Sequence, residues 1–428
     1  MKRKEFSNCI IAFAIILFCS SSYGACSSDN EEIDSASKGT ETPQDPENGK
    51  AVEEIQYLSL TSQQREQVKT SNDFAFRLAQ ATMKDDKSQV ISPLSVAYLT
   101  GMLANGVSEN TLNEIATVLG MNGKSLQEIN SYFKMMLNDL PRLDLSTTLS
   151  QSNALFTNQG YIIFDEYKKT ISEFYCADLE TLDFNQQSAI VHINNWVNEH
   201  TKGMIKGIVD NIDSKAAAYG LNAVYFKGGW INKFNIEDTR EETFGTNGGK
   251  LPMMHLNANL LYAEMDMCKL IQMPYGNGAF LMTVLLPNEG MTTTKLMEKI
   301  DAETFNKLSL SVCPYNVDVK MPRFETECET GLIDVLTNLG MPSLFSKQER
   351  FEKMTTDNFN VSGMVQTAGI KVDENGSEAA AITHVMFTSN GNEPEIKPAS
   401  FHANRPFIYI ISERDHDIIL FLGHYEGD

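Results

Sequence analysis

The chain has 428 residues, 42% of them hydrophobic and 21% charged, so it can bury a large core and is neither a disordered chain nor a small disulfide-dependent scaffold. Its 35 Lys and Arg against 56 Asp and Glu leave a formal charge of −21. Because no basic patch offsets that charge, nucleic acid is excluded as an expected partner.

The first 25 residues have the pattern of an export signal. Residues 2–4 are Lys-Arg-Lys and precede an apolar run at residues 9–18, which is too short for the roughly 20 residues of a membrane-spanning helix. The segment ends in Gly-Ala-Cys26, which resembles the cleavage site of a bacterial lipoprotein signal, where the Cys becomes acylated. Tyr23 departs from that pattern, so ordinary signal cleavage is the alternative to lipidation at Cys26.

Residues 26–55 are rich in Ser, Pro, Gly and acidic residues and show no apolar periodicity. Such a segment cannot bury enough surface to offset its chain entropy, so we expect a flexible acidic tether. Asp29, Glu31 and Glu32, close behind Cys26, resemble the surface-export signal of Bacteroidetes lipoproteins. The expected location is therefore the outer membrane, through the N-terminal lipid, with the protein exposed at the surface. A periplasmic or secreted protein is the alternative.

Residues 56–428 have a globular composition without a second linker, which predicts one domain. Its first half is mainly helical. Asn72 or Asp73 is expected to cap one helix, and Pro93, directly after Ser92, to open the next.

Two further helices are expected in this half. A capping-box pattern at residues 111–114 precedes an apolar run and predicts a helix that ends at Gly120. Apolar residues spaced at i, i+3 and i+7 within residues 190–197 predict an amphipathic helix that ends by Gly203.

The second half changes period. Short apolar runs at residues 279–286, 407–411 and 418–422 predict buried strands of a large sheet. Late helices are expected near residues 292–299 and 331–339. Helices first and strands later favour an α+β fold.

Chemistry-bearing residues do not cluster along the chain. The cysteines beyond residue 26 form no C-x-x-C pair, so we expect four separate, mostly buried thiols, and one disulfide stays open as an alternative. These cysteines are Cys176, Cys268, Cys313 and Cys328. No H-E-x-x-H, G-x-S-x-G, Walker or G-x-G-x-x-G pattern is present, so we expect no metal and no cofactor. A hydrolase assembled from distant residues is the remaining enzymatic alternative.

One stretch, residues 366–406, does not fit an ordinary core. After Ile370 and Val372, which fit a strand, it contains about 25 residues without a convincing helix or turn-bounded strand. Long loops of this kind are uncommon in compact domains and are usually functional or disordered. A loose surface excursion is the alternative to a functional loop.

Side-chain alternation distinguishes these two interpretations. If Ser377 points inward in an extended segment, Ala379 and Ala381 also point inward, whereas Glu378 and Ala380 point outward. The inward set is uncharged and begins with very small residues. This pattern suits a loop that can enter between two existing strands and become a strand itself.

This segment resembles the hinge and reactive-centre loop of a serpin, and the resemblance covers roughly residues 60–428. The motifs that carry it are Glu374-x-Gly-Ser-Glu-Ala-Ala-Ala381, Ile91-Ser92-Pro93-x-Ser95, Asn194-x-Trp196-Val197, Asn222-Ala-Val-Tyr-Phe-Lys-Gly-Gly-Trp230, Met321-Pro322-Arg323-Phe324 and Phe401-x-Ala403-Asn404-Arg405-Pro406-Phe407. The resemblance implies three β-sheets, about eight to nine helices and an exposed loop, at about residues 374–400, that can insert into the largest sheet.

The resemblance also implies a function, which is that of a monomeric protease inhibitor and not of an enzyme. A target protease would attack the loop and form a covalent acyl-enzyme. The freed arm, hinged at residues 376–377, would then insert as a new strand and trap the protease before water releases it. A non-inhibitory serpin that acts as a binding module or chaperone is the alternative, but the small hinge residues favour inhibition.

Individual residues take roles through the same resemblance. The hinge residues are Glu374, Gly376, Ser377, Glu378, Ala379, Ala380 and Ala381. The residues of the gate and of the region that holds the sheet closed are Ser92, Ser95, Asn222, Gln366 and Trp230, with helix capping or core packing as the alternative. Gln366 replaces the His of many family members, which leaves open whether this gate responds to pH.

The scissile bond is expected after about Asn390, within the residues Met386, Phe387, Thr388, Ser389, Asn390 and Gly391. Residues 377–390 contain no Arg or Lys, so elastase-, chymotrypsin-, subtilisin- or papain-like targets are favoured over trypsin-like ones. The charge of the chain argues against activation by heparin.

Overall fold

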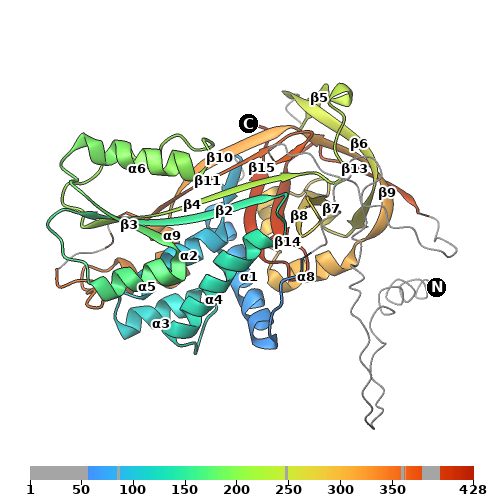
Figure 1. Ribbon diagram of the computed structural model, residues 1–428. Helices are drawn as coiled ribbons and strands as arrows, with labels where there is room; N and C mark the ends of the chain where they lie inside the picture. The colour runs from blue at the N-terminus through green and yellow to red at the C-terminus, as the bar shows by residue number, and fades with distance from the viewer. Residues whose placement is uncertain (1–55, 84–86, 246–248, 358–360, 362, 378–395) are drawn as a thin grey trace, which may run out of the picture. The chain divides into compact units, whose positions relative to one another are not determined.

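The computed structural model describes residues 56–83, 87–245, 249–357, 361, 363–377 and 396–428 (Figure 1). The chain divides between residues 53 and 54 into two units, and every described residue belongs to the second unit. The helices of the described residues are α1 (Ser62–Thr82), α2 (Pro93–Ala104), α3 (Glu109–Val118), α4 (Leu126–Asp139), α5 (Asp165–Tyr175), α6 (Gln187–His200), α7 (Thr293–Met297), α8 (Ala302–Ser311) and α9 (Ile333–Leu339), with 3-10 turns η1 (Leu140–Arg142), η2 (Ile236–Asp238) and η3 (Ser343–Phe345). No helix in these ranges is long and apolar enough to cross a membrane.

The described strands form three sheets. A nine-stranded sheet has the order β1 (Gln89–Ile91), β15 (Ile419–Tyr425), β14 (Phe407–Glu413), β8 (Phe280–Pro287), β7 (Cys268–Tyr275), β6 (Gly249–Glu264), β9 (Cys313–Pro322) and β13 (Pro398–His402), with β5 (Arg240–Phe244) on β6. A four-stranded sheet has the order β12 (Gly376–Ser377), β4 (Ala218–Gly229), β2 (Thr148–Asn158) and β3 (Ala177–Leu182). β10 (Phe324–Gly331) and β11 (Val365–Val372) form a pair of their own. The prediction of an α+β fold with three sheets is confirmed.

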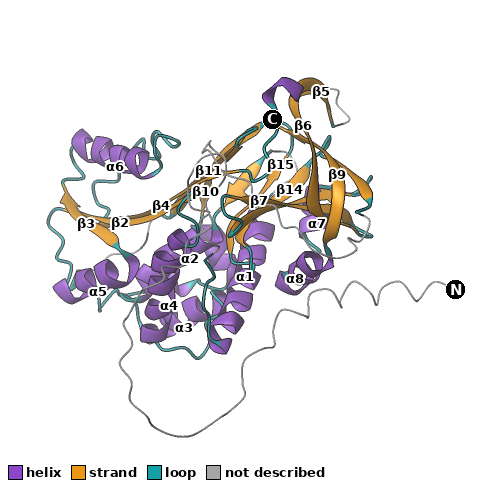
Figure 2. Cartoon of the chain, turned by 45° about the vertical axis from the view of Figure 1, so that its right-hand side comes forward, coloured by secondary structure: helices purple, strands orange, loops and turns teal. Residues whose placement is uncertain are grey.

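Helices cover both faces of the four-stranded sheet (Figure 2). On one face, α6 packs its apolar side, with Ile193 and Val197, against Phe156 of β2 and Leu221 of β4. On the other face lies α2, which is buried along nearly its whole length and therefore apolar on all sides. Helices therefore pack on both faces of this sheet.

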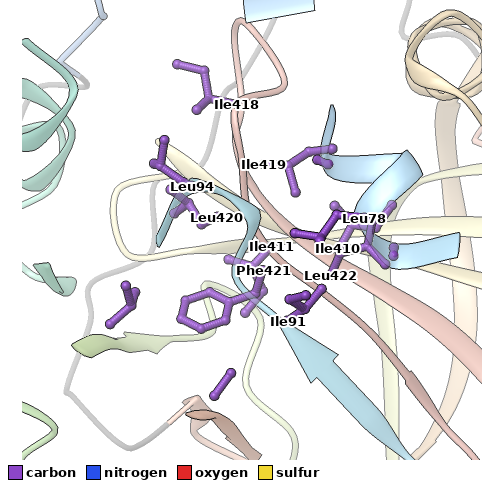
Figure 3. Packing of buried hydrophobic residues seen from close by; sticks show 14 of the residues in the cluster. Leu78, Ile91, Leu94, Ile410, Ile411, Ile418, Ile419, Leu420, Phe421 and Leu422 are labelled. Carbon is purple, nitrogen blue, oxygen red and sulfur yellow. The ribbon is translucent and has the colours of Figure 1, made fainter. Parts of the chain in front are cut away.

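Within the nine-stranded sheet, β14 and β15 form a hairpin whose strand residues are all buried. Its isoleucines and leucines pack against Leu78 of α1 and Leu94 of α2, as Figure 3 shows. This hairpin corresponds to the apolar runs near residues 407–411 and 418–422, and β8 to the run at 279–286, so these strand predictions are confirmed.

Two helix starts were predicted wrongly, whereas Pro93 opens α2 as expected. The first helix begins ten residues or more before Asn72, because Thr61 and Gln64 form a capping box there. Asn72 is instead buried inside α1, and its side chain donates to the backbone oxygen of Asp417 at 2.8 Å. The third helix is capped by Ser108, so residues 111–114 lie within its first turns and not at its cap.

The four described cysteines are free thiols, and the one disulfide that the sequence left open is not present among them. Only Cys268 is fully buried, so the expectation of mostly buried thiols is wrong. Burial raises the pKa of the Cys268 thiol to about 11 and therefore keeps it protonated at neutral pH.

Two carboxyl groups lie where β14 turns into β15, next to α1 and α8: Glu413 is buried and Asp417 is half-buried. Burial raises the pKa of Asp417 to about 6, although a hydrogen bond from Ser309 opposes the shift. Burial also raises the pKa of Glu413, whose carboxylate accepts the backbone N–H groups of residues 415 and 416. A raised carboxyl pKa means that folding favours the protonated form, so the stability that Asp417 contributes falls as the pH rises from about 4 to about 6.

Asp417→Asn should therefore stabilise the protein at pH 7.5, by about 1–3 kcal/mol of unfolding free energy. Asn tolerates the left-handed backbone of this residue, where φ is 57°, and it carries no charge to bury. The stabilisation should shrink towards zero at about pH 3, because only below the ordinary pKa of 3.8 is the wild-type carboxyl largely protonated in both states. Urea unfolding at the two pH values measures the difference, and an equal effect at both would contradict the assignment.

Candidate functional site

The edges of β4 and β11 face one another without a ladder between them. The two strands are neighbours in the fold (Figure 1), yet among the described residues β11 forms a ladder only with β10. On its side towards β11, β4 forms a ladder among the described residues only at Gly228 and Gly229, with the short strand β12. Between the described strands, the rest of these two facing edges forms no ladder, which is a geometry that can accept an added strand.

The segment after β11 already begins to fill this place. The chain reverses at residues 373–376, where the backbones of Asp373 and Gly376 bond in both directions, at 2.9 and 3.3 Å. Gly376 has a φ of 142°, and a Cβ there would lie 2.1 Å from the oxygen of Gly228, so only glycine fits. Gly376 and Ser377 then pair with β4 in antiparallel register. We expected the hinge to enter the largest sheet. It enters the four-stranded sheet instead, because without a ladder between β4 and β11 these two strands belong to separate sheets.

Ser377 lies beneath the sheet and is 1% exposed. Its hydroxyl bonds the hydroxyl of Tyr275 at 2.8 Å, and the Tyr275 ring stacks on Trp230 with centroids 4.2 Å apart. Trp230 in turn donates from its indole nitrogen to the backbone oxygen of Asp373 at 3.0 Å, and from its backbone nitrogen to Asn375 at 2.8 Å. Trp230 therefore supports the turn from below, and the packing around Ser377 leaves no room for a large side chain.

Glu374 fastens the same turn from its other side. Its carboxylate is 3% exposed and accepts hydrogen bonds from Arg323 and Thr239, each at 2.6 Å. Burial alone would raise the pKa of Glu374, but these two donors outweigh it and hold the pKa below its ordinary value of 4.5. The backbone oxygen of Glu374 also accepts from the N–H of Phe234 at 3.0 Å. We call Glu374, Arg323 and Thr239 the latch.

The first turn of α2 holds both edges of the divided sheet. Gln366 of β11 accepts the N–H of Ser92 at 3.0 Å and donates to its backbone oxygen at 2.9 Å. Three residues further along α2, the hydroxyl of Ser95 donates to Asn222 of β4. The side-chain amide of Asn222 in turn donates a hydrogen bond to the side-chain oxygen of Asn153 of β2 at 2.7 Å. The two edges are therefore fastened side by side to one helix and not to each other.

This gate contains amides and hydroxyls, and its described members include no ionisable side chain. The Ser92 hydroxyl does not cap α2, which argues against capping as its role.

Several expected site residues lie outside the described residues. They are Glu378, Ala379, Ala380 and Ala381 of the hinge, the residues 386–391 around the scissile bond, and Cys26. The structure adds Thr239, Tyr275 and Asn153, which sequence analysis missed because isolated polar residues carry no local signal. Arg323 belongs to one of the motifs that carry the family resemblance, but only its contact with Glu374, 51 residues away, indicates its role.

Comparisons with known proteins agree with this geometry. A family model described as "Serpin (serine protease inhibitor)" matches residues 69–426. An uncharacterized serpin-like protein of Thermococcus kodakarensis is 32% identical to this chain, over 84% of this chain and 85% of that protein. Human Serpin B3 is 31% identical, over 83% of this chain and 97% of that protein. Among solved structures, the thermophilic serpin Tengpin in its native state has a TM-score of 0.76 at 25% identity, over 87% of this chain and 96% of that one. Human thyroxine-binding globulin complexed with thyroxine has the same TM-score at 26% identity, over 85% of this chain and 98% of that one.

Removing the cation of the latch should loosen the turn. Arg323→Gln leaves a buried carboxylate with weaker partners, and because the Arg323 side chain is 43% exposed we expect a loss of only about 1–3 kcal/mol at pH 7. Since the folded pKa of Glu374 is lowered, the stabilisation is present above its ordinary pKa of 4.5 and is lost as the pH falls below it. Urea midpoints at pH 7 and pH 3.5 test this, with Arg323→Lys as the control that keeps a cation. A loss of equal size at both pH values would show that Arg323 acts by packing alone.

Proposed function

The chain belongs to the serpin family of serine protease inhibitors, and we propose that it is an irreversible suicide-substrate inhibitor that traps its target by inserting its own loop between β4 and β11. As a serpin it is a protease inhibitor and not an enzyme. The observation that carries the finer proposal is the pairing of Gly376 and Ser377 with β4, next to two edges without a ladder between them.

Insertion is favourable because it supplies the missing ladder. Each backbone hydrogen bond formed in the sheet contributes about 0.5–1.5 kcal/mol net, and a strand between β4 and β11 gains bonds on both sides. The turn before it is already made, so the strand can extend from Ser377 without a new reversal of the chain. The strand would run antiparallel to both neighbours, as β12 does to β4.

Trapping the protease also requires that the cut loop inserts into the sheet faster than water hydrolyses the acyl-enzyme. Cleavage of the loop would leave the protease bound as an acyl-enzyme, and the inserting arm would carry it away from the hinge before water completes hydrolysis. The residues that the alternation places inward, Ser377, Ala379 and Ala381, are small and uncharged, which supports fast insertion because none of them must bury a charge. A non-inhibitory binding module or chaperone would not need this row, so the hinge favours inhibition over that alternative.

The bait sequence points to the class of target. Met386 and Phe387 followed by Thr388 and Ser389 suit elastase-, chymotrypsin- or subtilisin-like serine proteases, and by the same acyl chemistry papain-like cysteine proteases. Residues 377–390 contain no basic residue for a trypsin-like pocket. We place the scissile bond within residues 386–392.

A protease panel tests this function. The intact protein should form complexes that resist denaturing gels with at least one apolar-specific protease, and mass spectrometry of the released C-terminal fragment identifies the bond. Ser377→Arg forces a cation against Tyr275 in the covered sheet, at a cost of several kcal/mol, and should be cleaved without trapping the enzyme. Ala380→Arg, whose side chain the alternation is expected to place outward, is the matched control for an added charge outside the bait. Cleavage of the wild type without any covalent complex would reject inhibition.

Cleavage of the loop should stabilise this protein. In an ordinary domain a cut loop lowers stability or leaves it unchanged, whereas here the freed arm completes a covered sheet. We expect the melting midpoint to rise by tens of degrees after a cut within residues 385–392, by the addition of a buried strand to a large domain. Calorimetry of the intact and cut forms measures this. A cut form that melts at or below the intact one would mean that no insertion follows.

We further propose that the protein is a lipoprotein acylated at Cys26 and displayed on the outer surface of the outer membrane, which rests on the sequence alone. The tether of about 30 residues that the sequence predicts could then hold the inhibitor several nanometres from the lipid, where incoming proteases arrive. Cys26→Ala should move the protein out of the membrane fraction, and protease added to intact wild-type cells should be captured. Complexes that form only after lysis would contradict surface display.

A further inference from the structure

α6 presents an unusual stripe of side chains to the edge strand β3. His192, Trp196 and His200 follow at i, i+4 and i+8 and therefore share one face of the helix. Opposite them, Asp178 and Glu180 alternate along β3 and share one face of the sheet. Two imidazoles and one indole thus meet two carboxylates.

Short contacts join every member of this stripe to a carboxylate of β3. His192 Nε2 lies 2.7 Å from Glu180, and His200 Nε2 lies 3.8 Å from Asp178. The Trp196 indole N–H donates to Asp178 at 2.9 Å. The His200 ring stacks on Trp196 with centroids 4.2 Å apart, and its Nδ1 lies 2.7 Å from the Trp196 backbone oxygen. The stripe therefore fastens the whole length of α6 to β3. We call these five residues the clasp.

The segment that follows α6, residues 201–212, reaches from β4 to β11. Ile205 and Val209 belong to the apolar cluster that includes Leu221 and Ala223 of β4. The side chain of Met204 lies against Gly369 of β11, with its sulfur 3.3 Å from the position that a Cβ would take there.

A single side chain ties this segment back to the helix. Asn194 of α6 accepts the N–H groups of Ile208 and Val209, at 2.9 and 3.0 Å, and donates to the oxygen of Val209 at 2.9 Å. The segment and α6 are therefore expected to move together. Because the segment touches both edges, β4 and β11 cannot part without displacing it.

We propose that the clasp sets the rate at which β4 and β11 separate to admit a strand, with His192 and His200 as positioning residues that hold α6 in its closed place. This inference rests on the proposed function, because it concerns the strand insertion on which inhibition depends. The clasp opposes insertion, so weakening it makes the sheet open sooner. Its contacts are half exposed, with 30–54% of each ionic side chain accessible, so each pair should change the rate by about two- to fivefold.

The test measures how fast the intact protein takes up a labelled synthetic peptide with the sequence of residues 377–388, followed on native gels. Asp178→Asn keeps an acceptor for the Trp196 indole while removing the charge beside His200, and His192→Ala removes the other pair. The matched control is Glu173→Gln, which breaks the Lys134–Glu173 pair between α4 and α5 at a similar exposure. His192→Gln is the conservative rescue, since its amide can still donate to Glu180.

We expect peptide uptake two- to fivefold faster than wild type for Asp178→Asn and for His192→Ala, and wild-type rates for Glu173→Gln and His192→Gln. His192→Ala with Glu180→Ala should be no faster than either single variant, because both remove the same contact. Urea midpoints of all variants are measured in parallel, since a merely structural pair would lower the midpoint without changing uptake.

Unchanged uptake in both clasp variants, or an equal increase in Glu173→Gln, would overturn the clasp while leaving the proposed inhibition intact. Wild-type protein that takes up no peptide and forms no covalent complex would instead overturn the proposed function itself. The two failures are therefore distinguishable.

Discussion

The structure depends on one missing interaction, the ladder between β4 and β11. Sheet strands normally satisfy their backbone groups through their neighbours, and leaving an edge without a partner is unfavourable. Here the two edges are held next to each other by the first turn of α2, through Gln366 to Ser92 on one side and Asn222 to Ser95 on the other. The native fold is therefore maintained by side chains beneath the sheet, and under the proposed mechanism a strand between the edges would give an arrangement of lower energy.

The remaining features of the site either prepare this place for a strand or restrain it. Gly376 and Ser377 already pair with β4, and Tyr275 and Trp230 support the turn from below. The latch holds the turn at Glu374, and on the covered face α6 and the segment after it span both edges. In the proposed mechanism, preparation would make insertion fast once the loop is cut, whereas restraint would prevent insertion while the loop is intact. An inhibitor that relies on a race with deacylation requires both.

The described gate residues beneath the sheet carry no ionisable side chain, whereas ionisable side chains lie in the elements around the gate. The gate beneath the sheet consists of amides and hydroxyls, with Gln366 where many family members have His, and its described members carry no group that could titrate. Carboxyl groups with shifted pKa values include Glu374 of the latch, whose pKa is lowered, and Asp417 at the turn between β14 and β15, where burial raises the pKa to about 6. These two groups should therefore contribute to the response of the fold to pH.

Local patterns determined those parts of the protein that depend on near neighbours in the chain. Pro93 after Ser92 specified the start of α2, apolar spacing specified α6, and apolar runs specified β8, β14 and β15, because helix and strand periods are set over a few residues. The small residues of the hinge and their alternation predict an entering strand, of which the described residues include only Gly376 and Ser377 as β12, and for the later hinge residues this stays a prediction. The start of α1 was missed because Asn72 has the chemistry of a cap, but its amide bonds Asp417, 345 residues away. Only the tertiary structure decided that Glu374 meets Arg323 and Thr239, that one turn of α2 holds both edges, and that α6 is clasped to β3. Each of these contacts joins residues that are distant in the chain, and such pairings follow from packing, which no local pattern encodes.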